Sequence, residues 1–309
     1  MKKFFTRLSL LLMFGGAANF AAFSQTEKAI ETAAKVSVSF CVASGDVKVR
    51  GWERNEVRVW IEGGGTANFK VKERDPQNKP VWLFVLGSSN DPKKYDECLR
   101  GENIEIELPY SASVGIKSPN SNGSSFAVDS IAKAVVINID SDVQLRNITQ
   151  EIEVSSLSGN VAAEDSKGKI LIKTFGGDIA AFRLSPNDFS DTLKLASTSG
   201  SIVMRDITHK NIEAVSTNGE LSIYNSLVRG GSYNFNTTNG VVTLQLPADF
   251  PFQIRATLNA GGNFQNDFPI KFNMTSVPGQ SRLITGSNGA GDTSINLTTF
   301  NGMLRLRKK

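Results

Sequence analysis

Apolar residues alternate with polar residues on both sides of a recurring glycine. The glycines at 159, 177, 200, 219 and 240 are spaced by 18, 23, 19 and 21 residues. In each copy, apolar side chains stand seven and five residues before the glycine and two and four residues after it. A period of two is typical of a strand with one buried face, whereas a helix would need apolar residues three or four positions apart. Each copy therefore predicts a strand, a tight corner at the glycine and a second strand.

The repeat also predicts how these units assemble. Further copies stand near both ends of the chain, around Gly45 and Gly302, and weaker alternation occupies 104–116, 135–145 and 254–258. A unit of about 20 residues is too small to bury its own apolar face, so such units stack on one another. We therefore expect an all-β protein that forms a single-domain parallel β-solenoid, resembling a β-helix, from about residue 34 to 307. Its coils would hold roughly 20 residues each.

The corners carry a second regular feature. Ser or Thr stands three residues before the glycine in six copies, and we expect these hydroxyls to point inward and bond one another or the corner backbone. A residue that recurs with the structural repeat is better explained by structure than by a role as a nucleophile. We expect the glycines themselves to adopt positive φ, which glycine tolerates. The six residues are Ser156, Thr174, Ser197, Ser216, Thr237 and Thr299.

Two segments interrupt the repeat. Residues 63–103 and 261–292 are rich in Gly, Asn, Asp or Pro, and we interpret both as looped insertions in one domain that spans 25–309. Their expected role is to cover the ends or a flank of the solenoid, whose bare edges would otherwise pair with other strands. Contact with a ligand is the alternative, because binding loops often lie on rigid scaffolds.

Residues 1–24 are typical of a bacterial secretory signal peptide. Lys2, Lys3 and Arg7 precede an apolar stretch, and small residues at Ala22 and Ser24 predict cleavage before Gln25. The alternative is a membrane anchor, but about 15 apolar residues are fewer than the roughly 20 that span a bilayer. We expect an exported protein, either periplasmic or at the cell surface or secreted, with no integral membrane segment in its mature chain.

The amino-acid composition limits the kinds of functional site that the chain can form. The formal net charge is +4, and loss of the three basic residues of the leader reduces it to about +1, so no nucleic-acid footprint remains. The chain has two Cys and one His, too few for the three or four ligands of a zinc or iron–sulfur site. A histidine-dependent triad could use only His209, which we expect to be exposed in a turn. The sequence thus predicts neither a metal site nor a cofactor, and no catalytic residue.

The two cysteines are candidates for a disulfide. Cys41 lies between Phe40 and Val42, both expected to face inward, so its own side chain should face outward, toward a cysteine of the 63–103 segment. An exported chain favours a bond between Cys41 and Cys98, since oxidising compartments retain disulfides. Two unrelated thiols are the alternative.

The three tryptophans all lie in the first third of the chain. Trp52, Trp60 and Trp82 could offer aromatic faces to a ligand such as a sugar ring. More often a tryptophan at the end of a solenoid buries a large surface, and we favour that interpretation.

Several motifs resemble the bacterial putative-adhesin family. They are Ser-Gly-Asp-Val-Lys-Val-Arg-Gly-Trp at 44–52, the glycine corners at 198–200, 217–219 and 238–240, and the closing segment 298–306. The resemblance covers nearly all of the mature chain. It implies a secreted or envelope β-solenoid domain of unknown function, and the family supplies no catalytic residues.

Two functional hypotheses follow. The first is a non-catalytic envelope or cell-surface β-solenoid, adhesin-like or associated with envelope stress, that binds an envelope protein or a surface glycan. The second is a carbohydrate-active β-helix enzyme, a polysaccharide lyase or hydrolase. Hydrolysis needs two carboxyl groups about 5–10 Å apart. The matching positions Asp178 and Asn160 of neighbouring coils do not supply such a pair, nor do Ser201 and Glu220, so we favour the first hypothesis.

Overall fold

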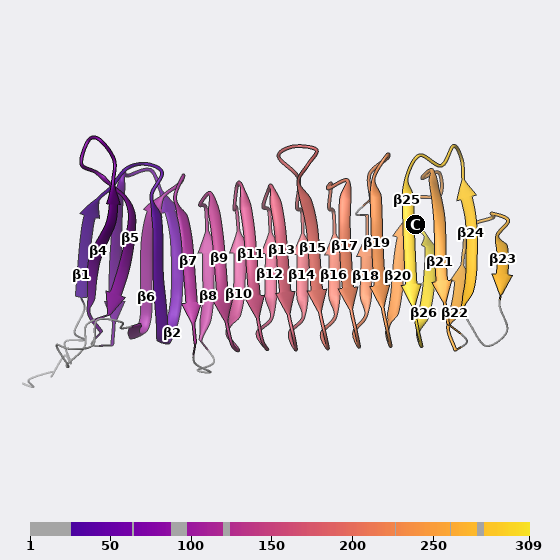
Figure 1. Ribbon diagram of the computed structural model, residues 1–309, viewed down its shortest axis with the longest axis horizontal. Helices are drawn as coiled ribbons and strands as arrows, with labels where there is room; N and C mark the ends of the chain where they lie inside the picture. The colour runs from indigo at the N-terminus through magenta and orange to yellow at the C-terminus, as the bar shows by residue number, and fades with distance from the viewer. Residues whose placement is uncertain are drawn as a thin grey trace, which may run out of the picture.

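Each sequence repeat forms one coil of a parallel β-solenoid in the computed structural model (Figure 1). The coil around Gly159 is an example, with β11 (Glu151–Ser156) in one sheet and β12 (Val161–Glu164) in a second sheet. The prediction of an all-β solenoid is therefore confirmed. The described part of the chain contains no helix that is long and apolar enough to cross a membrane. The structure describes residues 26–63, 65–87, 98–119, 124–225, 227–259, 261–276 and 281–309.

The strands that follow the corner glycines form the first sheet, which we call sheet A. Its central strands are parallel, and β1 and β3 add to one end in antiparallel pairings. In spatial order, sheet A contains β1 (Thr26–Glu31), β3 (Glu56–Glu62), β6 (Leu99–Pro109), the second half of β2 (Ser37–Trp52), β8 (Ser125–Asp129), β10 (Asp142–Arg146), β12, β14 (Ile179–Phe182), β16 (Ile202–Arg205), β18 (Leu221–Tyr224), β20 (Val241–Leu246), β26 (Met303–Lys308) and β22 (Asn263–Asn266).

The strands that precede the corner glycines form sheet B. It is again parallel in the middle, with antiparallel strands at both ends. In spatial order, sheet B contains β4 (Ala67–Arg74), β5 (Pro80–Gly87), the first half of β2, β7 (Ser113–Ser118), β9 (Lys133–Asn138), β11, β13 (Lys169–Thr174), β15 (Thr192–Ser197), β17 (Asn211–Ser216), β19 (Ser232–Thr237), β25 (Ser294–Thr299), β21 (Phe252–Leu258), β24 (Arg282–Asn288) and β23 (Asn273–Ser276).

The coils nearest the two termini are not the ends of the stack. The coil formed by β2 lies between the β5–β6 strands and the β7–β8 coil. The β25–β26 coil likewise lies between the β19–β20 coil and the β21–β22 strands. The two segments expected as looped insertions supply part of these outer elements, and in the structure they contain strands: β4, β5 and the start of β6 in 63–103, and β22, β23 and β24 in 261–292. The strands β1, β3 and β21 supply the rest.

Ladders of apolar side chains fill the space between the sheets. Equivalent residues of successive coils stand directly above one another, and each is at most 2% exposed. One ladder in sheet B consists of Ile152, Ile170, Leu193, Ile212 and Tyr233. At about 25 cal/mol per Å² of buried apolar area, this continuous core is the main stabilising contribution. It makes the solenoid a rigid support for its surface.

At the central corners, glycine is required for close approach of the coils and not for positive φ. A Cβ atom on Gly200 would lie 2.0 Å from the backbone oxygen of Gly177, and one on Gly219 would lie 2.0 Å from that of Gly200. Neither residue has a positive φ, so our expectation was wrong at these two corners. At the first corner, Gly45 has a φ of 104°, as expected. The left-handed conformation occurs at the opposite corner, after the sheet A strands, where Asn147, Asp165, Asp206 and Asn225 are among the residues with φ near 50°. Asn and Asp tolerate this region better than most residues.

The inward hydroxyls connect neighbouring corners, as predicted. Ser197 Oγ accepts a hydrogen bond of 2.8 Å from the Gly200 backbone N–H and donates one of 3.1 Å to the oxygen of Gly177. Ser216 repeats the arrangement with Gly219 and Gly200. These buried hydroxyls therefore satisfy backbone groups where the chain leaves sheet B.

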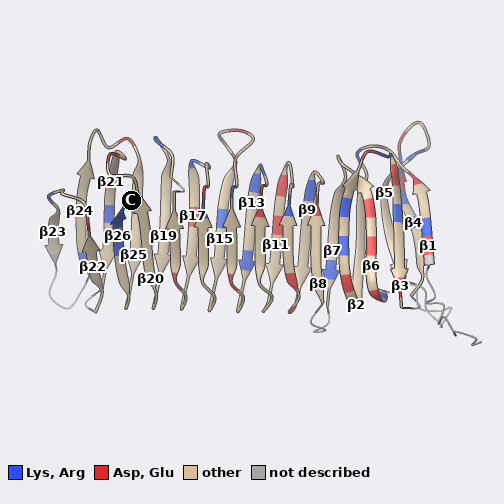
Figure 2. Ribbon diagram, turned by 180° about the vertical axis from the view of Figure 1, so that it is seen from behind, with Lys and Arg blue, Asp and Glu red and all other residues tan. Residues whose placement is uncertain are grey.

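Charged residues gather at the N-terminal end of the solenoid. Figure 2 shows blue and red positions along β1, β2, β3, β6 and β7, whereas β19, β20, β21 and β25 are mostly tan. The most polar surface thus lies where β1 and β3 extend sheet A.

Candidate functional site

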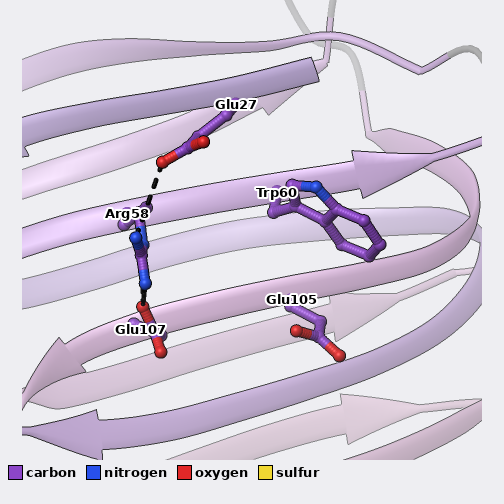
Figure 3. A pocket seen from close by; sticks show the side chains of 5 residues that line it. All are labelled: Glu27, Arg58, Trp60, Glu105 and Glu107. Atoms are coloured by element: carbon purple, nitrogen blue, oxygen red, sulfur yellow. Dashed lines mark hydrogen bonds and ion pairs between the residues drawn. The ribbon is translucent and has the colours of Figure 1, made fainter. Parts of the chain in front are cut away.

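A pocket on the outer face of sheet A combines a tryptophan with four charged residues (Figure 3). Alternation along β3 points Arg58 and Trp60 outward, and alternation along β6 does the same for Glu105 and Glu107. The antiparallel register places Arg58 opposite Glu107 and Trp60 opposite Glu105. On the other side of β3, Glu27 of β1 stands opposite Trp60. Residues from three strands therefore meet in one place.

Arg58 organises the charges of the pocket. Its Nε donates a 2.8 Å hydrogen bond to Oε2 of Glu107, its Nη2 contacts the same oxygen, and its Nη1 lies 3.6 Å from Oε1 of Glu27. The bond to Glu107 is the main cause that raises the pKa of the guanidinium. Arg58 therefore stays charged and holds two of the three carboxylates.

Trp52 supports Arg58 from the neighbouring coil. The guanidinium carbon of Arg58 lies 4.8 Å from the centre of the Trp52 ring, and that of Arg54 lies 5.1 Å from it. Trp52 Nε1 donates a 2.8 Å hydrogen bond to the backbone oxygen of Glu56. Cation–π contacts of this kind stabilise by about 0.5–1 kcal/mol at exposed sites. Trp52 thus contacts Arg58 but is not among the residues that line the pocket.

The pocket is small and net negative. Its volume is about 220 Å³, below the roughly 300–1,000 Å³ of typical drug-sized sites. Glu27, Glu105 and Glu107 outnumber Arg58, although Lys48 lies 3.6 Å from Glu105. Within the described ranges, no cluster of three or more His, Cys, Asp or Glu is arranged to hold a metal ion. The arrangement suits one small, neutral or cationic ring.

Trp82 lies on the other sheet. It belongs to β5 and lines an apolar groove on the outer face of sheet B together with Phe84, whose ring centre is 6.0 Å away. It is 38% exposed. Of the predicted aromatics, Trp52 and Trp60 therefore belong to strands of sheet A, and Trp82 belongs to a strand of sheet B.

Cys41 and Cys98 form a disulfide at one end of this groove, with Cα atoms 4.4 Å apart. Cys41 is partly exposed between the buried Phe40 and Val42, which agrees with the alternation of β2. The bridge connects the β2 coil to the start of β6.

His209 is buried, so the expectation of an exposed turn histidine was wrong. Its side chain is 0% exposed, and Nε2 lies 2.8 Å from the backbone oxygen of Gly168. Because a carbonyl oxygen only accepts, Nε2 carries the proton, and Nδ1 has no hydrogen-bond partner. Burial lowers the pKa of the imidazole. His209 packs inside the solenoid and has no catalytic arrangement.

Sequence reasoning did not select Glu27, Arg58, Glu105 or Glu107. Alternation with Val57, Val59, Ile104 and Ile106 indicated that Arg58, Glu105 and Glu107 face outward, and no such alternation was noted around Glu27. The pairing of β3 with β6, however, joins residues 49 positions apart in antiparallel order. No repeat in the sequence signalled that pairing.

The comparisons with known proteins fit the fold. Residues 183–307 match the Toastrack DUF4097 family. The Toastrack match covers coils in the second half of the chain, and the pocket around Trp60 lies outside it. Together with the fold, it supports the resemblance to a family of unknown function.

Two solved structures are also similar to this chain. One is a putative cell adhesion protein from Clostridium sporogenes, with 12% identity, coverage of 93% of this chain and 100% of that chain, and a TM-score of 0.25. The other is a putative adhesin from Parabacteroides merdae, with 11% identity, coverage of 92% and 96%, and a TM-score of 0.47. No curated protein matches the sequence.

Proposed function

We propose that this protein is an exported, non-catalytic binding protein that presents a rigid β-solenoid at the bacterial envelope and binds a glycan in the Trp60 pocket. The observation that carries the proposal is the position of Trp60 beside Arg58, Glu105 and Glu27 on one outward face. A half-buried aromatic ring offers an apolar surface to a sugar ring, and the charged groups beside it bond hydroxyls. The ladders of the core hold these strands in place.

The charges of the pocket select the type of glycan. Three carboxylates against Arg58 disfavour acidic polysaccharides, because like charges at a binding site cost affinity. An amino sugar offers an ammonium group to Glu105 or Glu27, whose side chains are 49% and 59% exposed. We therefore expect neutral and amino sugars to bind, and uronic acid polymers not to bind.

A carbohydrate-active enzyme remains the second candidate, because Glu105 and Glu107 face outward two residues apart on one strand. Their Cα atoms lie about 7 Å apart at about 3.4 Å per residue, so the two side chains can bring their carboxyl groups to the separation that paired catalytic carboxyl groups need. Glu107, however, is bound through Oε2 to Arg58. A lyase or hydrolase would release reducing or unsaturated sugar ends from the polymer that it binds, and binding without such release favours the non-catalytic role.

The decisive experiment measures binding of residues 25–309 to immobilised chitosan, a neutral glucan and polygalacturonate. Trp60→Ala should abolish retention on chitosan, and Glu105→Gln should reduce it. Trp82→Ala is the matched control, since Trp82 lies on the opposite sheet, and it should bind like the unchanged protein. Equal binding by Trp60→Ala and the unchanged protein, or no retention on chitosan or the glucan, would overturn the assignment of this pocket.

Export and partner choice are tested in cells. The mature protein, recovered from the periplasm or medium, should begin at Gln25 by intact mass. Cross-linking in cells should recover envelope polysaccharide with the unchanged protein and less with Trp60→Ala. A single dominant envelope protein whose recovery does not depend on Trp60 would instead identify a protein partner.

A further inference from the structure

A second cavity, on sheet B, has a different chemical character from the Trp60 pocket. It has a volume of about 580 Å³, and its lining is mostly apolar. Its floor is formed by small outward residues, Ser39 of β2 and Gly115 of β7, which stand directly opposite each other. Phe84 of β5 continues this row on one side, and Val135 of β9 continues it on the other. The groove thus follows the strand direction, with an apolar wall on each side.

The walls of the groove expose large apolar side chains to solvent. Trp82 is 38% exposed and Ile137 is 49% exposed. On β11, the next strand beyond β9, the outward positions are instead occupied by Glu151 and Glu153. A contiguous apolar hollow with a polar surround is typical of a binding site.

The size of the groove limits what can occupy it. Trp82 and Leu86 of β5 are four residue steps apart, or roughly 13 Å at about 3.3 Å per step. The walls on β5 and β9 are three strand spacings apart, so their backbones are separated by roughly 14 Å. After the wall side chains are placed, the space is a narrow channel that fits one extended alkyl chain.

One cation stands at the end of the channel. Lys117 of β7 lies in the same row as Cys41 and Ile137, beside the disulfide. Among the described residues Lys117 is part of no ion pair, whereas Lys133, at the start of β9, lies 2.7 Å from Glu151. An ammonium group at the end of an apolar channel complements a ligand with an apolar chain and a terminal anion.

We propose that this groove binds a medium- or long-chain carboxylate, with the alkyl chain between Phe84 and Ile137 and the carboxylate at Lys117. The apolar walls provide most of the binding free energy through burial of methylene groups, at about 0.8 kcal/mol for each one fully buried. Lys117 sets the orientation of the chain. This site is separate from the Trp60 pocket, and the sugar-binding proposal does not depend on it.

Calorimetry with sodium dodecanoate, below its micelle concentration, tests the proposal on the purified 25–309 protein. Gly115→Val should weaken binding about tenfold or more, because the new side chain fills the floor. The variant is expected to fold, since the tightest contact of a Cβ on Gly115 is with the movable Ser39 Oγ, at 3.3 Å, and a β-branched residue suits a strand. An unchanged melting temperature checks this. Ala196→Val, on the outer face of β15, is the control for added volume.

A second pair of variants tests the orientation. Lys117→Gln should weaken dodecanoate binding about fivefold and leave dodecanol binding unchanged, as expected for one partly exposed charge pair. Lys173→Gln, an exposed lysine of β13, should affect neither ligand. Absence of dodecanoate binding, or equal affinity in folded Gly115→Val, would overturn the groove as the site. Equal losses for dodecanoate and dodecanol in Lys117→Gln would overturn the role of Lys117.

Discussion

A Cβ atom on Gly177 would lie 2.1 Å from the backbone oxygen of Gly159 in the preceding coil. The same atom on the adjacent Gly176 would have its nearest neighbour at 3.6 Å, an ordinary contact. Neither glycine has a positive φ. The two consecutive glycines therefore differ in how closely the backbone of the preceding coil approaches the position of a Cβ atom.

Gly177→Ala should destabilise the protein by about 1–3 kcal/mol or more, because the methyl group forces two coils apart. Gly176→Ala should be neutral or slightly stabilising, since it reduces the freedom of the unfolded chain. Urea unfolding of the two variants measures the difference in the free energy of unfolding. Equal stability would show that the coils can separate at this corner without cost.

The inward hydroxyl of Ser197 should contribute measurably to stability. Ser197→Ala leaves the Gly200 N–H and the Gly177 oxygen without their buried partner, which should cost about 1–3 kcal/mol. Ser199→Ala, two residues further and exposed, is the control and should change stability by less than about 0.5 kcal/mol. The free energy of unfolding is again the measurement, and a similar small change in both variants would contradict the role of the hydroxyl.

These corners show what the sequence could and could not predict. The alternation around Gly159 and Gly200 was enough to predict strands, corners, ladders and inward hydroxyls, because those follow from local spacing. The pairing of β3 with β6 and the position of β25 beside β19 join residues far apart in sequence, and spacing cannot indicate them. His209 lies beyond the end of β16, outside the strand whose alternation could be followed, so the sequence pattern did not indicate that its side chain is buried.

Stability should decrease as the pH falls from about 7 toward 5. Burial lowers the pKa of His209 below its ordinary 6.5, so the unfolded chain binds a proton before the folded one does. The folded state has its full stability above 6.5 and loses it as the pH falls toward the lowered pKa. Because the chain has a single histidine, the melting temperature in this range reports on one side chain.

His209→Gln should flatten the pH dependence of the melting temperature between pH about 7 and 5. The adjacent Lys210→Gln does not titrate in this window and should retain the slope. If the slope of His209→Gln equals that of the unchanged protein, another group is responsible.

Removal of the disulfide should destabilise the N-terminal coils. The bond between Cys41 and Cys98 closes a loop with a sequence separation of 57, and a loop of this length corresponds to about 4 kcal/mol in the chain-entropy model. The double variant Cys41→Ala, Cys98→Ala should therefore unfold at lower urea concentration. Under denaturing conditions the unreduced protein should not react with a thiol reagent, and rapid labelling of both cysteines would contradict the bond.

The position of the last coil has a consequence for biosynthesis. A chain that is synthesised from its N-terminus can stack its coils in order only as far as β20. The strands β21 and β22 emerge next, yet they pair with β25 and β26, which arrive last. Until residues 294–308 have been synthesised, the edges of β19 and β20 that later pair with β25 and β26 have no partner. This end of the solenoid is therefore complete only after residues 294–308 have been synthesised, and until then the nascent protein is most exposed to proteases and to pairing with other strands.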